Sequence, residues 1–298
     1  MFLFSGKYSV FSIWYLVKTC RTATKYQILN TKYWLAPVLA LFAMTEFAHA
    51  AAWTLPQDKS QMITNVVFYR TDEIFSPSGH RNDIPAFQKW EVNPYYEYGY
   101  RDDLTLGLSP FFHYLRQEQP GRGTDTNLGM AETEAFARYR FFERGHTVLS
   151  VQPLIKLPSL YTNDDPKAGR SQMDAELAVL GGYTFEWMGK EHFTEAKAAY
   201  RHRFGELDDQ YKFDATVGFT LTPDWQLMPK MFLVRDAGKH TSQTSVSGQS
   251  DYDLSKLQLS AVYHLDEAYA VEFGGFRHMD GENTGAGGGV LASFWVNW

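Results

Sequence analysis

Residues 130–142 read MAETEAFARYRFF, and charged and uncharged side chains alternate along them with a period of two. The even positions carry four charged residues, Glu132, Glu134, Arg138 and Arg140. The odd positions carry Ala131, Thr133, Ala135, Ala137, Tyr139 and Phe141. Successive side chains of a β-strand point to opposite faces, so this segment predicts a strand with one charged face and one largely apolar face.

Two kinds of protein use such a strand. In a soluble β-protein the apolar row packs on the core and the charged row faces water. In a membrane barrel the apolar row faces lipid and the charged row lines a wet lumen. Alternation alone does not distinguish them, so the rest of the chain has to decide.

The beginning of the chain has the pattern of a secretory signal peptide. Lys25 and Lys32 precede an apolar run at residues 33–44, and the small-x-small sequence Ala48-His49-Ala50 follows it. That order predicts export and cleavage before Ala51. The apolar run is also too short to span a membrane comfortably as a helix.

The chain therefore divides into a leader and signal peptide at residues 1–50 and a single predicted barrel domain at residues 51–298. Residues 1–24 lie upstream of the positively charged part that a signal peptide needs. Either the start codon is assigned too early or the leader is long, and the sequence leaves both alternatives open.

Composition narrows the class of protein. Without residues 1–50 the chain holds 23 basic and 33 acidic residues, a balance that argues against a nucleic-acid partner. The only cysteine, Cys20, lies in the leader, so no disulfide framework or thiol chemistry is expected. Export, many aromatic residues and no long apolar helix are typical of an outer-membrane barrel.

Strand-like segments recur along the whole domain. We expect twelve, at residues 60–70, 86–100, 104–116, 129–142, 146–157, 171–186, 191–203, 211–221, 225–236, 252–264, 269–279 and 287–298. Tight turns alternate with longer polar connections at residues 71–85, 117–128, 158–170, 204–210, 237–251 and 280–286. Short periplasmic turns and longer outer loops are the pattern of a membrane barrel. The predicted fold is thus all-β, a transmembrane antiparallel up-and-down β-barrel of about 12 strands with both termini periplasmic.

The charged rows are expected to face the lumen. The residues predicted to line it are Lys89, Glu91, Glu132, Glu134, Arg138, Arg140, Lys156, Asp174, Glu176, Glu195, Lys197, Arg201, Arg203, Lys212, Asp214 and Glu272. Opposing charges could shape the field in a pore and select solutes. Alternatively, adjacent strands pair Glu with Arg and fill a narrow barrel. Twelve strands lie between filled small barrels and open porins, so size does not decide.

Several aromatic rings share the parity of the charged rows. They are Tyr95, Phe111, His113, Phe193, Phe232, Phe276 and Trp295. Such rings could stack on an aromatic solute or simply occupy space inside the barrel.

The last strand-like segment ends the chain with an alternating apolar row, Val290, Ala292, Phe294, Val296 and Trp298. A C-terminal aromatic residue resembles the signal by which the outer-membrane assembly machinery recognises its clients, although Phe is the usual last residue. We therefore expect the barrel-assembly machinery, outer-membrane lipid and a small-molecule solute as partners.

The start of the barrel domain resembles a known family. Ala52-Trp53-Thr54 precedes a polar-aromatic strand, and a charged strand ends in Glu97-Tyr98-Gly99 before a turn and Leu104-Thr105-Leu106-Gly107. This pattern, strongest over residues 52–116, resembles the MetA-pathway family of outer-membrane transporters, which is associated with the meta-cleavage pathway of phenol degradation. The resemblance implies a barrel that passes small, often aromatic or apolar, molecules across the outer membrane, and it implies no catalytic residues.

The function expected is thus an outer-membrane channel or transporter for small molecules with a mixed-charge lumen. The alternatives are a plugged structural barrel and an outer-membrane enzyme resembling a lipid hydrolase, which would gather a serine, a histidine and an orienting group. Ser78-Gly79-His80 comes nearest to that set, but no G-x-S-x-G elbow surrounds it. Paired acidic residues such as Asp164-Asp165 and Asp208-Asp209 are the corresponding candidates for a protease.

No metal or cofactor is expected. The acidic groups at residues 163–165 and 251–253 lack a full calcium-ligand spacing, and the histidines lack zinc-binding spacing. The glycine-rich run at residues 285–289 lacks the lysine and helix of a phosphate-binding loop, so we expect it to bend or close the barrel.

Overall fold

The computed structural model describes residues 52–159, 165–238 and 250–298. The predicted leader at residues 1–50 and the predicted cleavage position lie outside these residues. Within them, no helix is long and apolar enough to cross a membrane.

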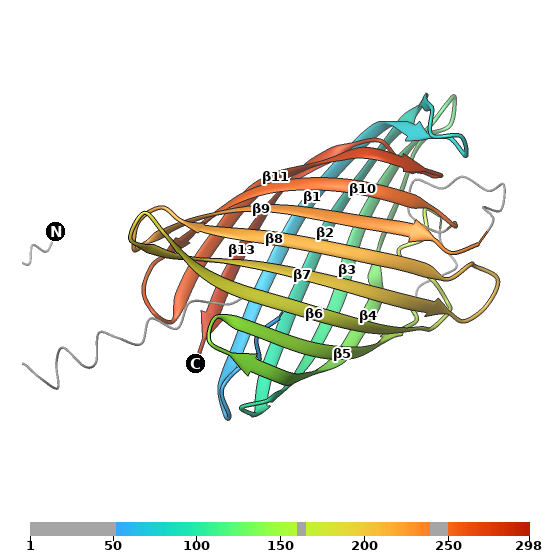
Figure 1. Cartoon of the computed structure of the whole chain (residues 1–298). Helices are drawn as coiled ribbons and strands as arrows, with labels where there is room; N and C mark the ends of the chain where they lie inside the picture. Colours follow the sequence, from blue (N-terminus) through green and yellow to red (C-terminus); the bar gives the residue numbers. More distant parts are fainter. Residues whose placement is uncertain (1–51, 160–164, 239–249) are drawn as a thin grey trace, which may run out of the picture. The chain divides into compact units, whose positions relative to one another are not determined.

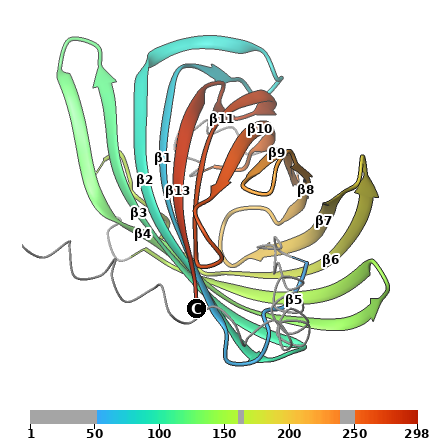
Figure 2. The ribbon, with the colours of Figure 1, turned by 90° about the vertical axis from the view of Figure 1, so that its left-hand side faces the viewer.

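The described chain forms one antiparallel sheet that closes on itself (Figures 1 and 2). Its strands are β1 (Ser60–Phe75), β2 (Arg81–Arg101), β3 (Leu104–Gln119), β4 (Gly123–Arg144), β5 (Thr147–Leu157), β6 (Asp174–Trp187), β7 (Lys190–Arg203), β8 (Gln210–Thr220), β9 (Trp225–Asp236), β10 (Asp253–His264), β11 (Tyr269–Glu282), the two-residue β12 (Thr284–Gly285) and β13 (Gly288–Asn297). Consecutive strands pair up to β11, β11 pairs with β13, and β1 pairs with both β2 and β13. The short β12 only extends the edge of β1. The predicted barrel of twelve antiparallel strands is confirmed.

Both chain ends of the domain and the tight turns lie at one end of the barrel, which we call the turn end. The backbone NH groups of Ser60 and Trp298 each donate to the other residue's carbonyl, at 2.8 and 3.0 Å. The opposite end, which carries the connections from β5 to β6 and from β9 to β10, is the loop end. Which end faces the periplasm remains a prediction.

The two faces of each strand differ as the alternation predicts. On β4, Ala135 pairs with Leu108 and Ile155, which are 46% and 39% exposed. Arg138, on the opposite face of the same strand, is 1% exposed. In the segment that opens the sequence analysis, charged side chains therefore point inward and apolar side chains form the outer surface.

One residue of that segment departs from the expectation. Pro110 pairs with Thr133 but Phe112 pairs with Met130, so β4 carries an extra residue, a β-bulge, at this point. A bulge places two consecutive residues on one face. Ala131 is therefore turned inward and only 1% exposed, and its predicted outward position is wrong.

The β1–β2 and β3–β4 hairpins are longer than predicted. The expected connections at residues 71–85 and 117–128 shrink to residues 76–80 and 120–122, because the flanking polar residues continue the β1–β2 and β3–β4 ladders. Polar composition indicates exposure to water, and both loops and exposed strand residues have it. Figure 1 shows these hairpins at the loop end of the barrel.

Glycine permits the close approach of strands where the barrel closes. Gly289 of β13 pairs with Tyr69 of β1, and a Cβ atom on Gly289 would lie 2.0 Å from the Phe68 carbonyl oxygen. Any other residue would force the two strands apart at this seam. The glycine-rich run thus lies at the closure, as the sequence predicts.

The inside–outside division can be tested on adjacent residues of β4. Ala135→Arg puts a charge among lipid-facing side chains and should cost about 2–4 kcal/mol of folding free energy near the bilayer midplane. Glu134→Gln changes an inward side chain and should leave the folded fraction nearly unchanged, because its partner Arg201 keeps a second carboxylate, Glu176, at 2.7 Å. Heat-modifiable migration and urea unfolding in lipid vesicles measure both, and an equal loss from both variants would contradict the assignment of faces.

Candidate functional site

The residues just before β1 enter the turn end of the barrel, where residues 52–55 are buried or half-buried and residues 56–59 are exposed. We call residues 52–59 the N-terminal plug. Ala52 is fully buried, and its carbonyl accepts a hydrogen bond of 2.6 Å from the Ser150 hydroxyl. The Trp53 ring meets the ring of Phe193 edge-on, with centroids 6.0 Å apart. The plug was not anticipated from the sequence, which offers no alternation over these residues.

The wall of the barrel is shaped to receive the plug. A Cβ atom on Gly99 would lie 2.0 Å from the Pro56 carbonyl oxygen, so only glycine lets the plug approach β2 so closely. The Thr54 hydroxyl donates to the Asp102 carbonyl at 2.6 Å, and the Leu55 NH donates to the Thr105 hydroxyl at 2.8 Å. The plug is thus hydrogen-bonded along its length to the β2–β3 hairpin.

Arg138 joins the plug to the wall. Its guanidinium donates to the Trp53 carbonyl at 2.9 Å and to the Gln152 side chain at 3.0 Å. It also forms an ion pair of 2.6 Å with Glu97, whose carboxylate is hydrogen-bonded by Tyr95. Glu97 is missing from the predicted lumen residues, although it shares the parity of Lys89 and Glu91 on the same strand. Because every partner of Arg138 is buried or nearly so, removing one partner leaves a charge without compensation.

The cost of that loss can be measured with Arg138→Ala. Breaking a buried ion pair from one side typically costs about 3–5 kcal/mol, because the remaining charge stays buried and unpaired. Arg140→Ala is the matched control, since its partner Glu143 has a side chain that is 50% exposed, and its loss should stay below about 1 kcal/mol. Urea unfolding of the refolded barrels gives both free energies. Equal losses would show that Arg138 is no more than a surface charge.

A second cluster, the central charge network, covers the inner wall from β4 to β8. It contains five cations and five carboxylates, Lys156, Arg170, Lys197, Arg201, Lys212, Glu132, Glu134, Asp174, Glu176 and Asp214. Arg201 bridges Glu134 and Glu176 at 2.8 and 2.7 Å. Glu176 also meets Lys197 at 3.7 Å and Lys212 at 3.2 Å. Pairing of opposite charges across strands therefore neutralises this wall. This agrees with the alternative in which acidic and basic residues of different strands pair with each other.

Part of the β5–β6 connection folds against the wall at the loop end. The Asn127 side chain donates to the Pro166 carbonyl at 2.9 Å, and His113 Nδ1 donates to the Ala168 carbonyl at 2.7 Å. Arg170 ends this stretch in an ion pair of 2.5 Å with Asp174. Arg170 was not predicted to face the lumen because it lies in a connection, where strand parity gives no information.

Aromatic rings occupy another part of the interior. Tyr69 and Phe276 stack with centroids 6.2 Å apart. The ammonium of Lys256 lies 3.9 Å from the Phe232 ring centroid and 5.4 Å from that of Phe276. Lys256 is a further inward cation that the prediction omitted, although Gln258 has the same parity and the pattern could have shown it.

A cavity of about 190 Å³ lies against the inner faces of β6 to β9. Its lining residues are Leu180, Glu195, Ala196, Lys197, Asp214, Thr216, Lys230 and Phe232. Lys230, which the prediction also missed, forms an ion pair of 2.9 Å with Glu272. Leu180 packs in one cluster with Ala52, so the cavity adjoins the N-terminal plug.

The predicted lumen residues fall into separate groups. Arg138 belongs to the plug contacts, and nine others form the central charge network together with Arg170. Lys89 and Glu91 pair at 2.8 Å, and Glu195 and Glu272 lie at or beside the cavity. Arg140 lies at the turn-end rim beside the Asp102 carbonyl, and Arg203 meets Asp251 at the loop end. The charges thus do not form a single ring.

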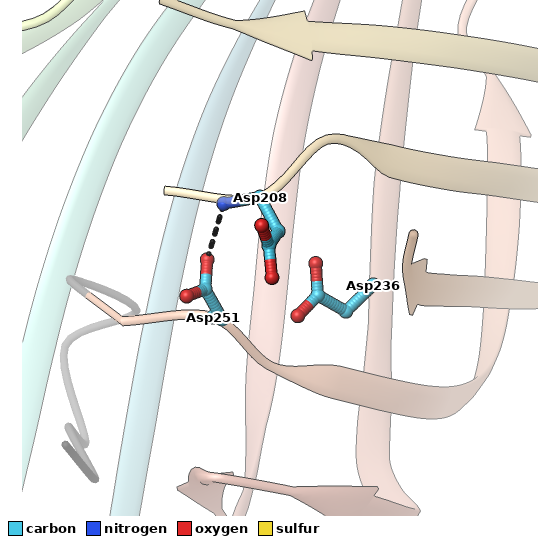
Figure 3. A group of neighbouring side chains, drawn as sticks. All are labelled: Asp208, Asp236 and Asp251. Atoms are coloured by element: carbon cyan, nitrogen blue, oxygen red, sulfur yellow. Dashed lines mark hydrogen bonds between the residues drawn. The ribbon is translucent and has the colours of Figure 1, made fainter. Parts of the chain in front are cut away.

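Three carboxylates from separate segments meet at the loop end. Figure 3 shows Asp208, Asp236 and Asp251, whose nearest oxygens lie within 4.8 Å of one another. One Asp251 oxygen accepts from the Asp208 NH at 2.9 Å and from the Arg203 guanidinium at 3.3 Å. Carboxylate oxygens suit hard cations such as Ca²⁺, but three residues are fewer than the six to eight ligands that calcium takes. The expectation that no metal binds stays a prediction.

The serine and histidine considered for an enzyme do meet. Ser78 Oγ and His80 Nδ1 are hydrogen-bonded at 2.9 Å in the exposed connection between β1 and β2. Among the described residues, no carboxylate is hydrogen-bonded to His80, so the third member of a catalytic triad is not seen. One of the acidic pairs considered for a protease is Asp164-Asp165, and Asp164 lies outside the described residues.

Comparison with known proteins identifies the fold. No family model and no curated protein matches the chain. The MetA-pathway resemblance therefore remains an expectation from residues 52–116. The COG4313 outer membrane channel from Pseudomonas putida F1 superimposes with a TM-score of 0.64 at 14% identity, covering 85% of this chain and 100% of that one. The NanC porin gives a TM-score of 0.51 at 8% identity, covering 79% of this chain and 98% of that one. At these identities the likeness establishes one conclusion, that the chain has the fold of an outer-membrane β-barrel.

Proposed function

We propose that this protein is an outer-membrane channel or transporter for small molecules in a Gram-negative bacterium, exported with a cleaved signal peptide. The observation that carries the proposal is the division of the barrel into two surfaces. Large apolar side chains such as Leu108, Leu177 and Phe273 are exposed on the outside, whereas the ion pairs of Arg138 and Arg201 are buried within. A barrel with that division is stable in lipid and holds a polar interior.

The central charge network would give the passage a polar wall without a large net charge. Each cation of the network has a carboxylate partner, so neither sign of solute is strongly repelled by this wall. Inward rings such as Phe232 and Phe276 offer apolar contact in another part of the lumen. This combination supports passage of small molecules, including the aromatic or apolar ones that the family resemblance implies.

The N-terminal plug bears on whether the lumen is open or filled. It narrows the turn end through contacts of Trp53 and Arg138, so we expect the intact chain to conduct weakly. If the turn end faces the periplasm, the plug is the last obstacle that an entering solute meets.

The last strand supports the expected route of assembly. The outward row of β13 is exposed at Val290 and Phe294, as is Trp298 directly after the strand, whereas Trp295 is buried inside. An apolar strand that ends the chain in an aromatic residue fits recognition by the barrel-assembly machinery, and its outward face fits lipid.

Conductance in a planar bilayer tests the channel. The chain of residues 51–298 should give small discrete steps, and the chain of residues 60–298, which lacks the plug, should give larger ones because the turn end is wider. Trp53→Ala in the full domain is a milder variant that should fall between them. Barrels that fold, as shown by heat-modifiable migration, but stay silent in all three forms would contradict the proposal and favour a filled barrel or an enzyme, to be tested by lipid hydrolysis with Ser78→Ala as control.

Ion selectivity tests the role of the charge network. Glu134→Gln removes the carboxylate 2.8 Å from Arg201 and leaves the wall with one excess positive charge. The reversal potential in a salt gradient should shift toward anion preference. Glu143→Gln, at the exposed rim, is the control and should shift it little, because exposed charges are screened by salt. Identical reversal potentials for the wild type and Glu134→Gln would show that ions do not pass this wall.

A further inference from the structure

Glu195 of β7 differs from the other carboxylates that line the cavity. Its side chain is hydrogen-bonded to the Thr216 hydroxyl and to the Ala52 backbone, both of which are neutral groups. The oxygen Oε2 is buried and has no hydrogen-bond partner among the described residues. A buried carboxylate without a counterion is costly, so an ionised Glu195 calls for a cation.

The two cations that line the cavity are already paired with other carboxylates. Lys197 lies 2.9 Å from Asp214, and Lys230 lies 2.9 Å from Glu272. Arg138, which also attracts Glu195, forms its ion pair with Glu97. Within the described part of the chain, Glu195 makes no ion pair of its own, and it is the lining carboxylate that is left without a partner cation.

We propose that Glu195 binds an ammonium group in this cavity. A volume of about 190 Å³ is ample for such a group, since a single water needs only about 10–15 Å³. The free oxygen of Glu195 supplies the charge-assisted hydrogen bond to such a group. A neutral guest would leave the carboxylate uncompensated.

The ammonium group has two possible sources. The first is the chain itself: the Ala52 backbone is bonded to Glu195, and successive backbone nitrogens lie within roughly 4 Å of each other. Cleavage before Ala51, as the sequence predicts, would therefore create an α-ammonium group close to this carboxylate. The second source is the amine of a solute, and that arm rests on the proposed channel function.

Thermal unfolding of the refolded chain of residues 51–298 separates the two sources. The chain is prepared with a free α-amine and with an α-acetylated one, checked by intact mass, each with and without Glu195→Gln. Methylammonium chloride is the probe, compared with sodium chloride at equal ionic strength. Glu191→Gln, an exposed carboxylate on the same strand, is the control.

If the chain supplies the ammonium, Glu195→Gln should lower the unfolding temperature of the free-amine form and leave the acetylated form unchanged. Methylammonium should then stabilise only the acetylated form, in which the site is vacant. If a solute supplies it, methylammonium should stabilise both forms, and Glu195→Gln should weaken its apparent affinity about tenfold or more. Either result supports the ammonium site, and Glu191→Gln should behave like the wild type.

The proposal is overturned if methylammonium stabilises neither form and Glu195→Gln has no effect on either. The carboxyl group would then be protonated and need no counterion. Unfolding does not depend on conduction, so failure of this site and failure of the channel function are separate outcomes.

Discussion

The structure depends on one requirement, that every backbone NH and carbonyl group in a strand that crosses lipid finds its partner within the protein. An open sheet leaves two edges unpaired, and this chain removes them by pairing β1 with both β2 and β13. Closure gives each strand an inside and an outside, so a period of two in the sequence becomes a division between lumen and surface. Gly289 lets the two strands of the seam approach each other.

Closure also encloses the inward charges, and charges that are buried need partners within the protein. Arg201 between Glu134 and Glu176, and Arg138 against Glu97, show the solution: each of these cations is held by carboxylates from other strands of the wall. Such pairs contribute little net stability, because desolvation offsets most of their attraction. Their main effect is to penalise any register in which one partner is left alone, and so they specify the pairing of strands.

Much of the architecture follows from the sequence because the side-chain period of a strand survives in any barrel. The number of strands, the inward row of Glu134 and Arg138, and the closure at the glycine-rich run could all be predicted. The inward turn of Ala131 could not, because a bulge shifts the parity by one residue without a signature in composition. The lengths of the β1–β2 and β3–β4 hairpins were not predicted correctly, because polar strand residues can have the same composition as loop residues. The N-terminal plug could not be predicted, because its contacts with β2 and β3 are tertiary and leave no periodic pattern in the sequence. The inward position of Lys256 could have been predicted, because it has the same parity as Gln258.

The contacts of the N-terminal plug constrain the order in which the molecule can assemble. Ala52 touches residues of β5, β6 and β7, and Trp53 is held by Arg138 of β4, yet the plug is followed directly by β1, one side of the closing seam. Its binding surface therefore exists only after the middle of the sheet has curled. The first residues of the domain can therefore dock only after strands that follow them in the sequence have formed. Docking of the N-terminal plug requires the wall to have its final curvature.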